Sequence, residues 1–398
     1  MSIKRNSIFI IVILINHFVG TAQTSNLKLV EYSEITTGAS QFDKYTKQLT
    51  GKNVAIIANQ ASIIGDTHLV DTLLSQGINI TKIFCPEHGF RGTADAGKKI
   101  DDNIDPKTNI PIISLYGSHK EPTSNDLDDV DIVLFDLQDV GTRFYTYIST
   151  LTYVMDACAK NNIPIIVLDR PNPNAYYIDG PVLEMEHTSF VGLHPVPVVY
   201  GMTIGEYALM VAGEKWITEP DKLDLQVIPL KNWSHNTIVK LKTKPSPNLP
   251  NWQSVFLYPS LCFFEGTEMS IGRGTEYPFQ IFGHPNYLIG SYTFTPESTQ
   301  GATNPKYKNQ KCFGANLADV PNQYNSLPQQ LNLFWLINSY KVMNDSSDFF
   351  NNYFVKLAGT DELQKQIENG LTEVEIRKSW QPKLDDFRKT RSKYLLYP

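Results

Sequence analysis

The amino-acid sequence predicts an α/β fold built on a doubly wound, mostly parallel sheet. Short continuous runs of Val, Ile and Leu recur between residues 53 and 230, and amphipathic stretches separate them. Strands that are apolar on both faces are typical of parallel sheets that helices cover on both sides. Polar residues directly follow four of these runs, at the sheet edge where such folds collect their functional groups.

The elements follow in order along the chain. Strands are expected at 53–59, 78–85, 110–116, 130–138, 163–169 and 223–230, and helices at 68–76, 147–161 and 202–217. The proline-rich segment 242–252 interrupts this pattern and is the expected domain boundary. Beyond it, a loop at 266–285 precedes short strands, and helices are expected at 328–343, 360–369 and 373–394. We therefore expect a domain at 23–250 and a smaller one at 251–398.

The first 22 residues have the pattern of a cleaved signal peptide. Lys4 and Arg5 precede the apolar run 8–15, and small residues follow at 20–22. The apolar run is shorter than the roughly 20 residues that span a bilayer. A retained N-terminal anchor is the alternative. The expected location of the mature chain is periplasmic or secreted, without stable membrane insertion.

Charge and compartment exclude several classes of partner. The formal charge of −6 becomes −8 once Lys4 and Arg5 are removed, and no basic tract compensates for it, so no nucleic-acid partner is expected. Export also removes ATP and NAD from consideration. The four cysteines are far apart without CxxC spacing, which supports neither a zinc ribbon nor a redox motif. A disulfide is possible in an oxidising compartment, although buried thiols are the expectation.

The sequence lacks the motifs required for nucleotide-phosphate binding, for metal binding and for serine hydrolysis. Residues 92–98 read GxxxxGK, but Lys99 stands where a phosphate-binding loop needs Ser or Thr to hold Mg²⁺. No HExxH occurs and the histidines are scattered singly, so no metal site is expected. Ser270 has Glu268 where a nucleophile elbow needs glycine. An esterase acting on cell-wall substituents is therefore the weakest alternative.

Carboxylate chemistry remains, with Glu87 as its candidate. Glycoside hydrolysis needs one acid that protonates the leaving oxygen, and often a second carboxylate. Glu87 follows an apolar run and lies between Phe84 and Phe90, where loss of water would raise the pKa of its carboxyl group. A salt bridge to Arg91 or Arg143 is an equally open alternative and would lower that pKa. The candidate second carboxylates are Asp136, Asp139, Asp169, Glu265 and Glu268.

Four arginines stand in loops that contain Gly or Pro rather than on helix faces. They are Arg91, Arg143, Arg170 and Arg273. Because a guanidinium group matches a carboxylate with two parallel hydrogen bonds, a substrate that carries a carboxylate is plausible. Neutralisation of nearby aspartates is the alternative for at least one of them.

Several longer motifs together resemble a known bacterial family. They are FCPEHGFRG (84–92), SLYGS (114–118), VLFDLQDVGTRFYTYISTL (133–151), LDRPNP (168–173), GRGTEYPFQIFGHP (272–285) and the tail that begins IRKSW (376–380). The resemblance is to the exo-β-N-acetylmuramidases of the NamZ type, and it runs over nearly all of the mature chain.

The resemblance implies a Rossmann-like N-terminal domain, a smaller α+β C-terminal domain and an active-site cleft between the two. It implies release of terminal N-acetylmuramic acid from the non-reducing end of peptidoglycan fragments, a step of cell-wall recycling, without a metal or organic cofactor. The resemblance also implies that Glu87 is the catalytic residue, because the glutamate of the PEHG motif is the one proposed for the family. We expect Glu268 or Asp136 to assist it. The expected substrate-binding residues are His88, Arg91, Gln138, Asp139, Arg143, Tyr145, Asp169, Arg170, Asn172 and Arg273. An exported protein that binds muropeptides without cleaving them is the alternative.

Overall fold

A computed structural model describes residues 27–87, 89–90, 103–323, 329–343 and 348–398. The predicted signal peptide, His88 and Arg91 lie outside these ranges. Among the described residues, no helix is both long and apolar enough to cross a membrane.

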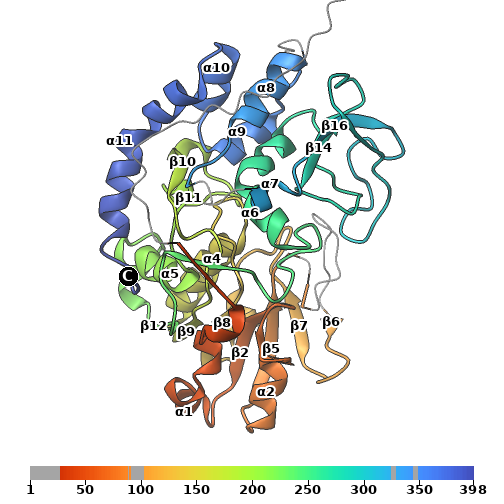
Figure 1. The fold of residues 1–398 in the computed structure, drawn as a ribbon. Helices are drawn as coiled ribbons and strands as arrows, with labels where there is room; N and C mark the ends of the chain where they lie inside the picture. Colours follow the sequence, from red (N-terminus) through yellow and green to blue (C-terminus); the bar gives the residue numbers. More distant parts are fainter. Residues whose placement is uncertain (1–26, 88, 91–102, 324–328, 344–347) are drawn as a thin grey trace, which may run out of the picture.

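The centre of the fold is a seven-stranded sheet (Figure 1). Six strands are parallel, and the short edge strand β6 runs antiparallel to β7. In spatial order the strands are β12 (Leu225–Ile228), β9 (Ile165–Leu168), β8 (Ile132–Asp136), β2 (Val54–Ala58), β5 (Ile80–Cys85), β7 (Pro111–Ser114) and β6 (Asn103–Ile104). All six predicted strands are present, and the fold prediction is confirmed.

Helices cover both faces of this sheet. On one face, Ile56 and Leu134 pack against Leu73 of α2 (Leu69–Ser75), near α1 (Thr46–Leu49). On the other face, Ile57 and Phe135 belong to a larger core with α4 (Tyr147–Asn161) and α5 (Ile204–Gly213). Alternate residues of one strand therefore face different cores, which explains the continuous apolar runs. The helix α4 has the predicted bounds, and the four-residue helix α3 (Ser124–Leu127) contacts it.

Three two-stranded pairs lie outside the central sheet. They are β1 (Lys28–Val30) with β13 (Thr237–Val239), β3 (Ile63–Ile64) with β4 (Thr67–His68), and β10 (Asp179–Val182) with β11 (Pro197–Val199).

The C-terminal part combines helices with a small antiparallel sheet in the order β14 (Ile281–His284), β16 (Cys312–Asn316) and β15 (Tyr292–Phe294). The helices are α6 (Trp252–Leu261), α7 (Val320–Gln323), α8 (Phe334–Val342), α9 (Asn352–Ala358), α10 (Glu362–Glu368) and α11 (Glu373–Arg391). In Figure 1 this part lies above the sheet, and α11 descends toward α5, where the chain ends. The hydroxyl of Tyr397, in that tail, donates to Asp169 Oδ2 at 2.5 Å.

The helix α6 was not predicted, because Pro259 lies inside it. Proline lacks an N–H, which leaves the carbonyl of Val255, four residues earlier, without its helical partner. The side chain of Asn174 replaces that partner and donates from Nδ2 to Val255 O at 3.3 Å. The cap residue Asn251 accepts from the N–H of Ser254 at 2.9 Å and begins the helix.

All four cysteines lie in the described residues, where all are buried and none forms a disulfide. The expectation of buried thiols is confirmed.

Candidate active site

Glu87 lies on a turn that follows the central strand β5. The strand ends at Cys85, whose carbonyl accepts from Leu115 N at 2.8 Å. The N–H of Gly89 then donates to Pro86 O at 3.1 Å and closes the turn. Gly89 has φ of +74°, a conformation that side chains with a Cβ rarely adopt. This turn places the half-buried Glu87 at the carboxyl edge of the sheet.

Glu87 lines a cleft of about 770 Å³. This volume is within the range of small-molecule sites. Its walls come from residues on both sides of the proline-rich segment 242–252. The residues that line the cleft include Glu87, Tyr116, Phe144, Phe190, Tyr258, Glu265, Arg273, Lys306, Tyr353 and Leu357. A small adjoining cavity of about 60 Å³ also contacts Glu87, together with Tyr145 and Tyr147.

Aromatic side chains surround Glu87. Burial raises the pKa of Tyr147, and the negative charge of Glu87 contributes to the increase. Burial likewise raises the pKa of Tyr353, with smaller contributions from neighbours that include Glu265 and Glu87. Glu87 therefore lies within electrostatic reach of tyrosines from both walls. Rings of this kind also offer faces on which the C–H surface of a sugar can pack.

The cleft contains an ion pair between Arg273 and Glu265. The guanidinium donates from Nε and Nη2 to the two carboxylate oxygens at 3.0 and 2.9 Å, and it lies 5.0 Å from the ring centroid of Phe279. Burial by itself would lower the pKa of Arg273, but Glu265 raises it above its ordinary value. Arg273 therefore lines the cleft with its charge already compensated by Glu265.

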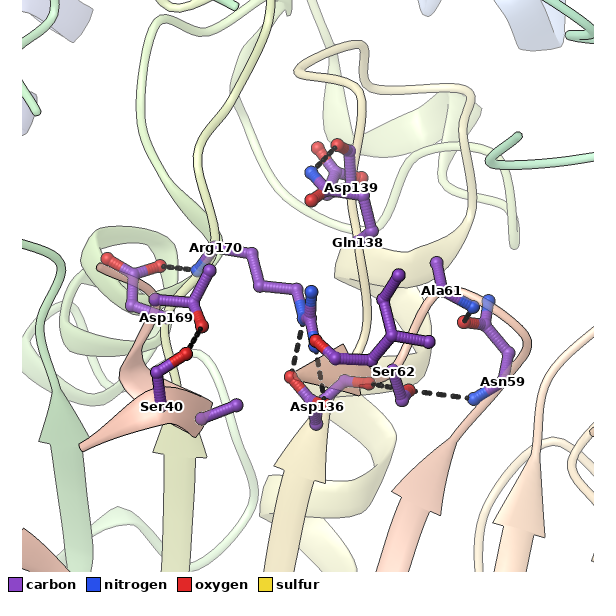
Figure 2. A network of polar contacts seen from close by, with 12 residues as sticks. Ser40, Asn59, Ala61, Ser62, Asp136, Gln138, Asp139, Asp169 and Arg170 are labelled. Carbon is purple, nitrogen blue, oxygen red and sulfur yellow. Dashed lines mark hydrogen bonds and ion pairs between the residues drawn. The ribbon is translucent and has the colours of Figure 1, made fainter. Parts of the chain in front are cut away.

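The polar residues at the other strand ends form a buried network (Figure 2). Asp136 and Arg170 face one another and make two hydrogen bonds at 2.5 and 2.8 Å, with both side chains at most 1% exposed. Arg170 Nη1 also donates to Tyr32 Oη at 3.0 Å. Asp136 therefore pairs with Arg170 and not with a substrate. Neither residue lines the cleft or the adjoining cavity.

Asp139 and Asp169 are buried in the same layer. Asp139 accepts from Gly141 N at 2.6 Å and from the hydroxyl of Tyr200, while burial raises its pKa to about 6. Asp169 accepts from Thr203 Oγ1 at 2.7 Å, and burial raises its pKa to about 7. The two carboxyl groups are thus held by protein donors.

Gln138 and Asn172 complete this layer through backbone contacts. Gln138 Nε2 donates to Pro171 O at 2.7 Å, and Asn172 Nδ2 donates to Met202 O at 2.7 Å. Both amide side chains are buried and fix loops instead of facing the cleft.

Arg143 joins the two parts of the chain. Its side chain is fully buried and donates to the carbonyl oxygens of Pro181, Val196, Leu357 and Ala358 at 2.6–2.9 Å. Burial lowers the pKa of Arg143 to about 9. Because Nη1 and Nη2 of Arg143 donate to backbone carbonyls that include that of Leu357, Arg143 fixes Leu357 in the cleft wall.

The comparisons with known proteins agree with this architecture. The family model for the N-terminal domain of the exo-β-N-acetylmuramidase NamZ matches residues 54–253, and the model for its C-terminal domain matches residues 256–397. The chain belongs to the NamZ family. The resemblance described above is thereby confirmed, together with the two-domain architecture.

Individual relatives of the NamZ family match over most of the chain. The peptidoglycan β-N-acetylmuramidase NamZ of Bacillus subtilis (strain 168) is 39% identical over 382 residues, which cover 89% of each chain. Crystal structures of two DUF1343 family proteins from Bacteroides fragilis are also similar. One is 44% identical with a TM-score of 0.83 and covers 91% of this chain and 99% of its own. The other is 30% identical with a TM-score of 0.76 and covers 92% and 99%.

The NamZ-family motifs divide into cleft residues and buried ones. Glu87 and Arg273 line the cleft, and Tyr145 lines the adjoining cavity. Glu268 lies next to the cleft-lining Met269, and its Oε2 is 3.7 Å from Nε2 of His284. Burial and the charge of Asp348 raise the pKa of Glu268.

Sequence reasoning missed Lys306 and the aromatic residues Tyr116, Phe190 and Tyr353 as lining residues. Tyr116 ends the predicted strand 110–116, whereas Phe190, Lys306 and Tyr353 lie outside the motifs described above, and folding brings all four to the cleft.

Among the described residues of this NamZ-family chain, one group has side chains that could hold a metal. The ligand atoms of Glu184, His187 and Asp361 lie within 4.8 Å of one another. Lys383 already pairs with Glu184, and Lys365 pairs with Asp361 at 2.6 Å. The two carboxylates are therefore neutralised by lysines, which favours an ion-pair cluster over a metal centre.

Proposed function

We propose that the protein is an exo-acting glycoside hydrolase that releases terminal N-acetylmuramic acid from the non-reducing end of peptidoglycan fragments. The observation that carries the proposal is the position of Glu87, which lines a cleft of about 770 Å³ beside aromatic side chains. The Bacillus subtilis relative, a peptidoglycan β-N-acetylmuramidase, supports the same substrate class.

In this proposal Glu87 acts as the general acid. It donates a proton to the glycosidic oxygen as the bond to the sugar breaks, and the departing saccharide leaves as an alcohol. The aromatic walls formed by Tyr116, Phe144 and Phe190 exclude water and orient the ring. Water then adds to the anomeric carbon and loses a proton to the Glu87 carboxylate, which completes hydrolysis and restores the acid.

We propose Glu265 as the second carboxylate in place of Glu268 or Asp136. Glu265 lines the cleft together with Glu87, and its bidentate contact with Arg273 fixes its orientation. A fixed negative charge stabilises the positive charge that develops on the sugar in the transition state. Asp136 is fully buried, and neither Asp136 nor Glu268 lines the cleft.

We also propose that the protein acts outside the cytoplasm, because residues 1–22 have the pattern of a signal peptide and peptidoglycan lies beyond the membrane. Its partner is then a saccharide with a terminal muramic acid.

Substitution of Glu87 by Gln tests the proposal. Glutamine has nearly the same shape but cannot donate a carboxyl proton, so turnover of a chromogenic muramic-acid glycoside should fall by about 10²- to 10⁴-fold. Glu186→Gln is the control, since that side chain is 76% exposed and lies outside the cleft. Full activity of Glu87→Gln would remove Glu87 from the chemistry. Binding of the glycoside by the wild-type protein without release of chromophore would instead support the muropeptide-binding alternative.

A further inference from the structure

The arginines expected to recognise a carboxylate are occupied by the protein itself. Arg143 donates to four backbone carbonyls, Arg170 pairs with Asp136, and Arg273 pairs with Glu265. The fourth, Arg91, lies outside the described residues. A substrate carboxylate therefore needs a different cation within the described cleft.

Lys306 is such a cation. It follows Pro305 in the segment 301–306, which forms one wall of the cleft, and its side chain is exposed there. The ammonium donates to Thr267 O at 2.5 Å and to Met269 O at 3.1 Å. An ammonium group has three N–H donors, so one donor remains after these two contacts. Among the described residues, no carboxylate forms an ion pair with Lys306, whereas Arg273 on the same cleft is paired.

The two backbone contacts orient the Lys306 ammonium without neutralising it. Carbonyl oxygens accept hydrogen bonds but carry no net charge. Partial exclusion of water lowers the pKa of Lys306, while the charges of Glu265 and Glu268 oppose this decrease. A carboxylate that approached the remaining N–H would replace lost hydration with a charge-assisted hydrogen bond.

We propose that Lys306 is a specificity-determining residue that binds the carboxylate substituent of the terminal sugar. The inference rests on the proposed function, because that function supplies a sugar with such a substituent. An otherwise equivalent sugar without the carboxylate, such as N-acetylglucosamine, lacks the partner and leaves the ammonium uncompensated. Lys306 thus discriminates between the two sugars without taking part in proton transfer.

Substitution of Lys306 by Met removes the charge while keeping the length of the side chain. The first readout is the binding of free N-acetylmuramic acid and of free N-acetylglucosamine, measured by ligand-observed NMR. The second is hydrolysis of the chromogenic glycosides of both sugars. Lys306→Met should weaken binding of the muramic sugar by about 10- to 100-fold, the scale of one hydrogen bond to a charged group, and leave the other sugar unchanged.

The KM for the muramic glycoside should rise by a similar factor, while kcat stays within about threefold. Lys306→Arg should recover part of the binding, because it restores the charge. Lys311→Met is the matched control, since Lys311 is also exposed, lies 5.3 Å from the ring centroid of Phe313 and does not line the cleft.

The binding readout separates this inference from the proposed function. Should the wild-type protein hydrolyse neither glycoside, the hydrolase proposal fails, and a Lys306-dependent preference for the muramic sugar in binding would still support the role of Lys306. The inference is overturned if the wild-type protein binds the two sugars equally. It is also overturned if Lys306→Met weakens binding of both sugars alike, or if it leaves the preference unchanged.

Discussion

Substitution of Asp136 by Asn would distinguish a structural role of this buried carboxylate from a catalytic one. Asp136 accepts two hydrogen bonds from Arg170, and the two side chains are 0% and 1% exposed. Removal of one member of a buried ion pair typically costs about 3–5 kcal/mol, because the remaining charge is left uncompensated. Asparagine keeps one acceptor oxygen, and Tyr32 still accepts from Arg170, so we expect about 3 kcal/mol.

Urea unfolding measures this loss directly. At an m-value of about 3 kcal/mol/M, the transition that reports on the N-terminal sheet should move about 1 M lower. Asp43→Asn is the control, because its contact with Lys44 is 3.8 Å long and both side chains are exposed, so its midpoint should not move. The double variant Asp136→Leu/Arg170→Met should be more stable than Asp136→Asn, since it leaves no unpaired charge. An unchanged midpoint together with a loss of turnover as large as that of Glu87→Gln would refute this reasoning and favour a catalytic Asp136.

Two further predictions concern the same buried layer. Burial raises the pKa of Asp139 to about 6, so this carboxyl group holds its proton more strongly in the folded state than in the unfolded state. The resulting stabilisation is fully present below about pH 4 and is lost as the pH rises through 6. The free energy of unfolding, measured with urea between pH 4 and 7, should therefore decline with pH in the wild-type protein. In Asp139→Asn the decline should be smaller by up to about 1.4 kcal/mol per pH unit, and identical slopes in the two proteins would contradict this prediction. Gly141→Ala should destabilise the protein by about 2 kcal/mol or more, because Gly141 has φ of +75° and a Cβ would lie 2.1 Å from Asn172 Oδ1. An unchanged urea midpoint for Gly141→Ala would show that the loop relaxes freely.

The sequence was sufficient for the six parallel strands of the central sheet, because strands such as β2, β8 and β9 are buried on both faces and read as continuous apolar runs. It was insufficient for α6, where Pro259 predicts a break, because the compensating donor Asn174 lies 81 residues away from Val255 in sequence. No local pattern reports a contact of that kind. The helix α9 (Asn352–Ala358) was also not predicted.

The site shows the same division between local and non-local information. Convergence of polar residues at one sheet edge follows from the topology of parallel strands, and the structure brings Asp136, Asp139, Asp169 and Arg170 into one layer (Figure 2). Whether such a layer is exposed to solvent depends on the segments that cover it. Those segments cannot be predicted from the residues around each strand. The position of Glu87 in the cleft follows from its turn, whereas Lys306 comes from a distant segment and was not predicted.

The buried layer also accounts for how the two walls of the cleft are kept in register. None of the four cysteines of the chain forms a disulfide, so no disulfide joins the two parts of the chain. Arg143 instead binds the carbonyl of Leu357, a residue of the C-terminal wall, from the loop that also carries the cleft residue Phe144. Since a guanidinium with several buried carbonyl partners has little freedom to reorient, Leu357 and Phe144 are held relative to each other. The polar residues of the LQDVGTR motif therefore act on the cleft through its geometry, and Glu87 carries the proposed chemistry on the turn after β5, the strand next to β2.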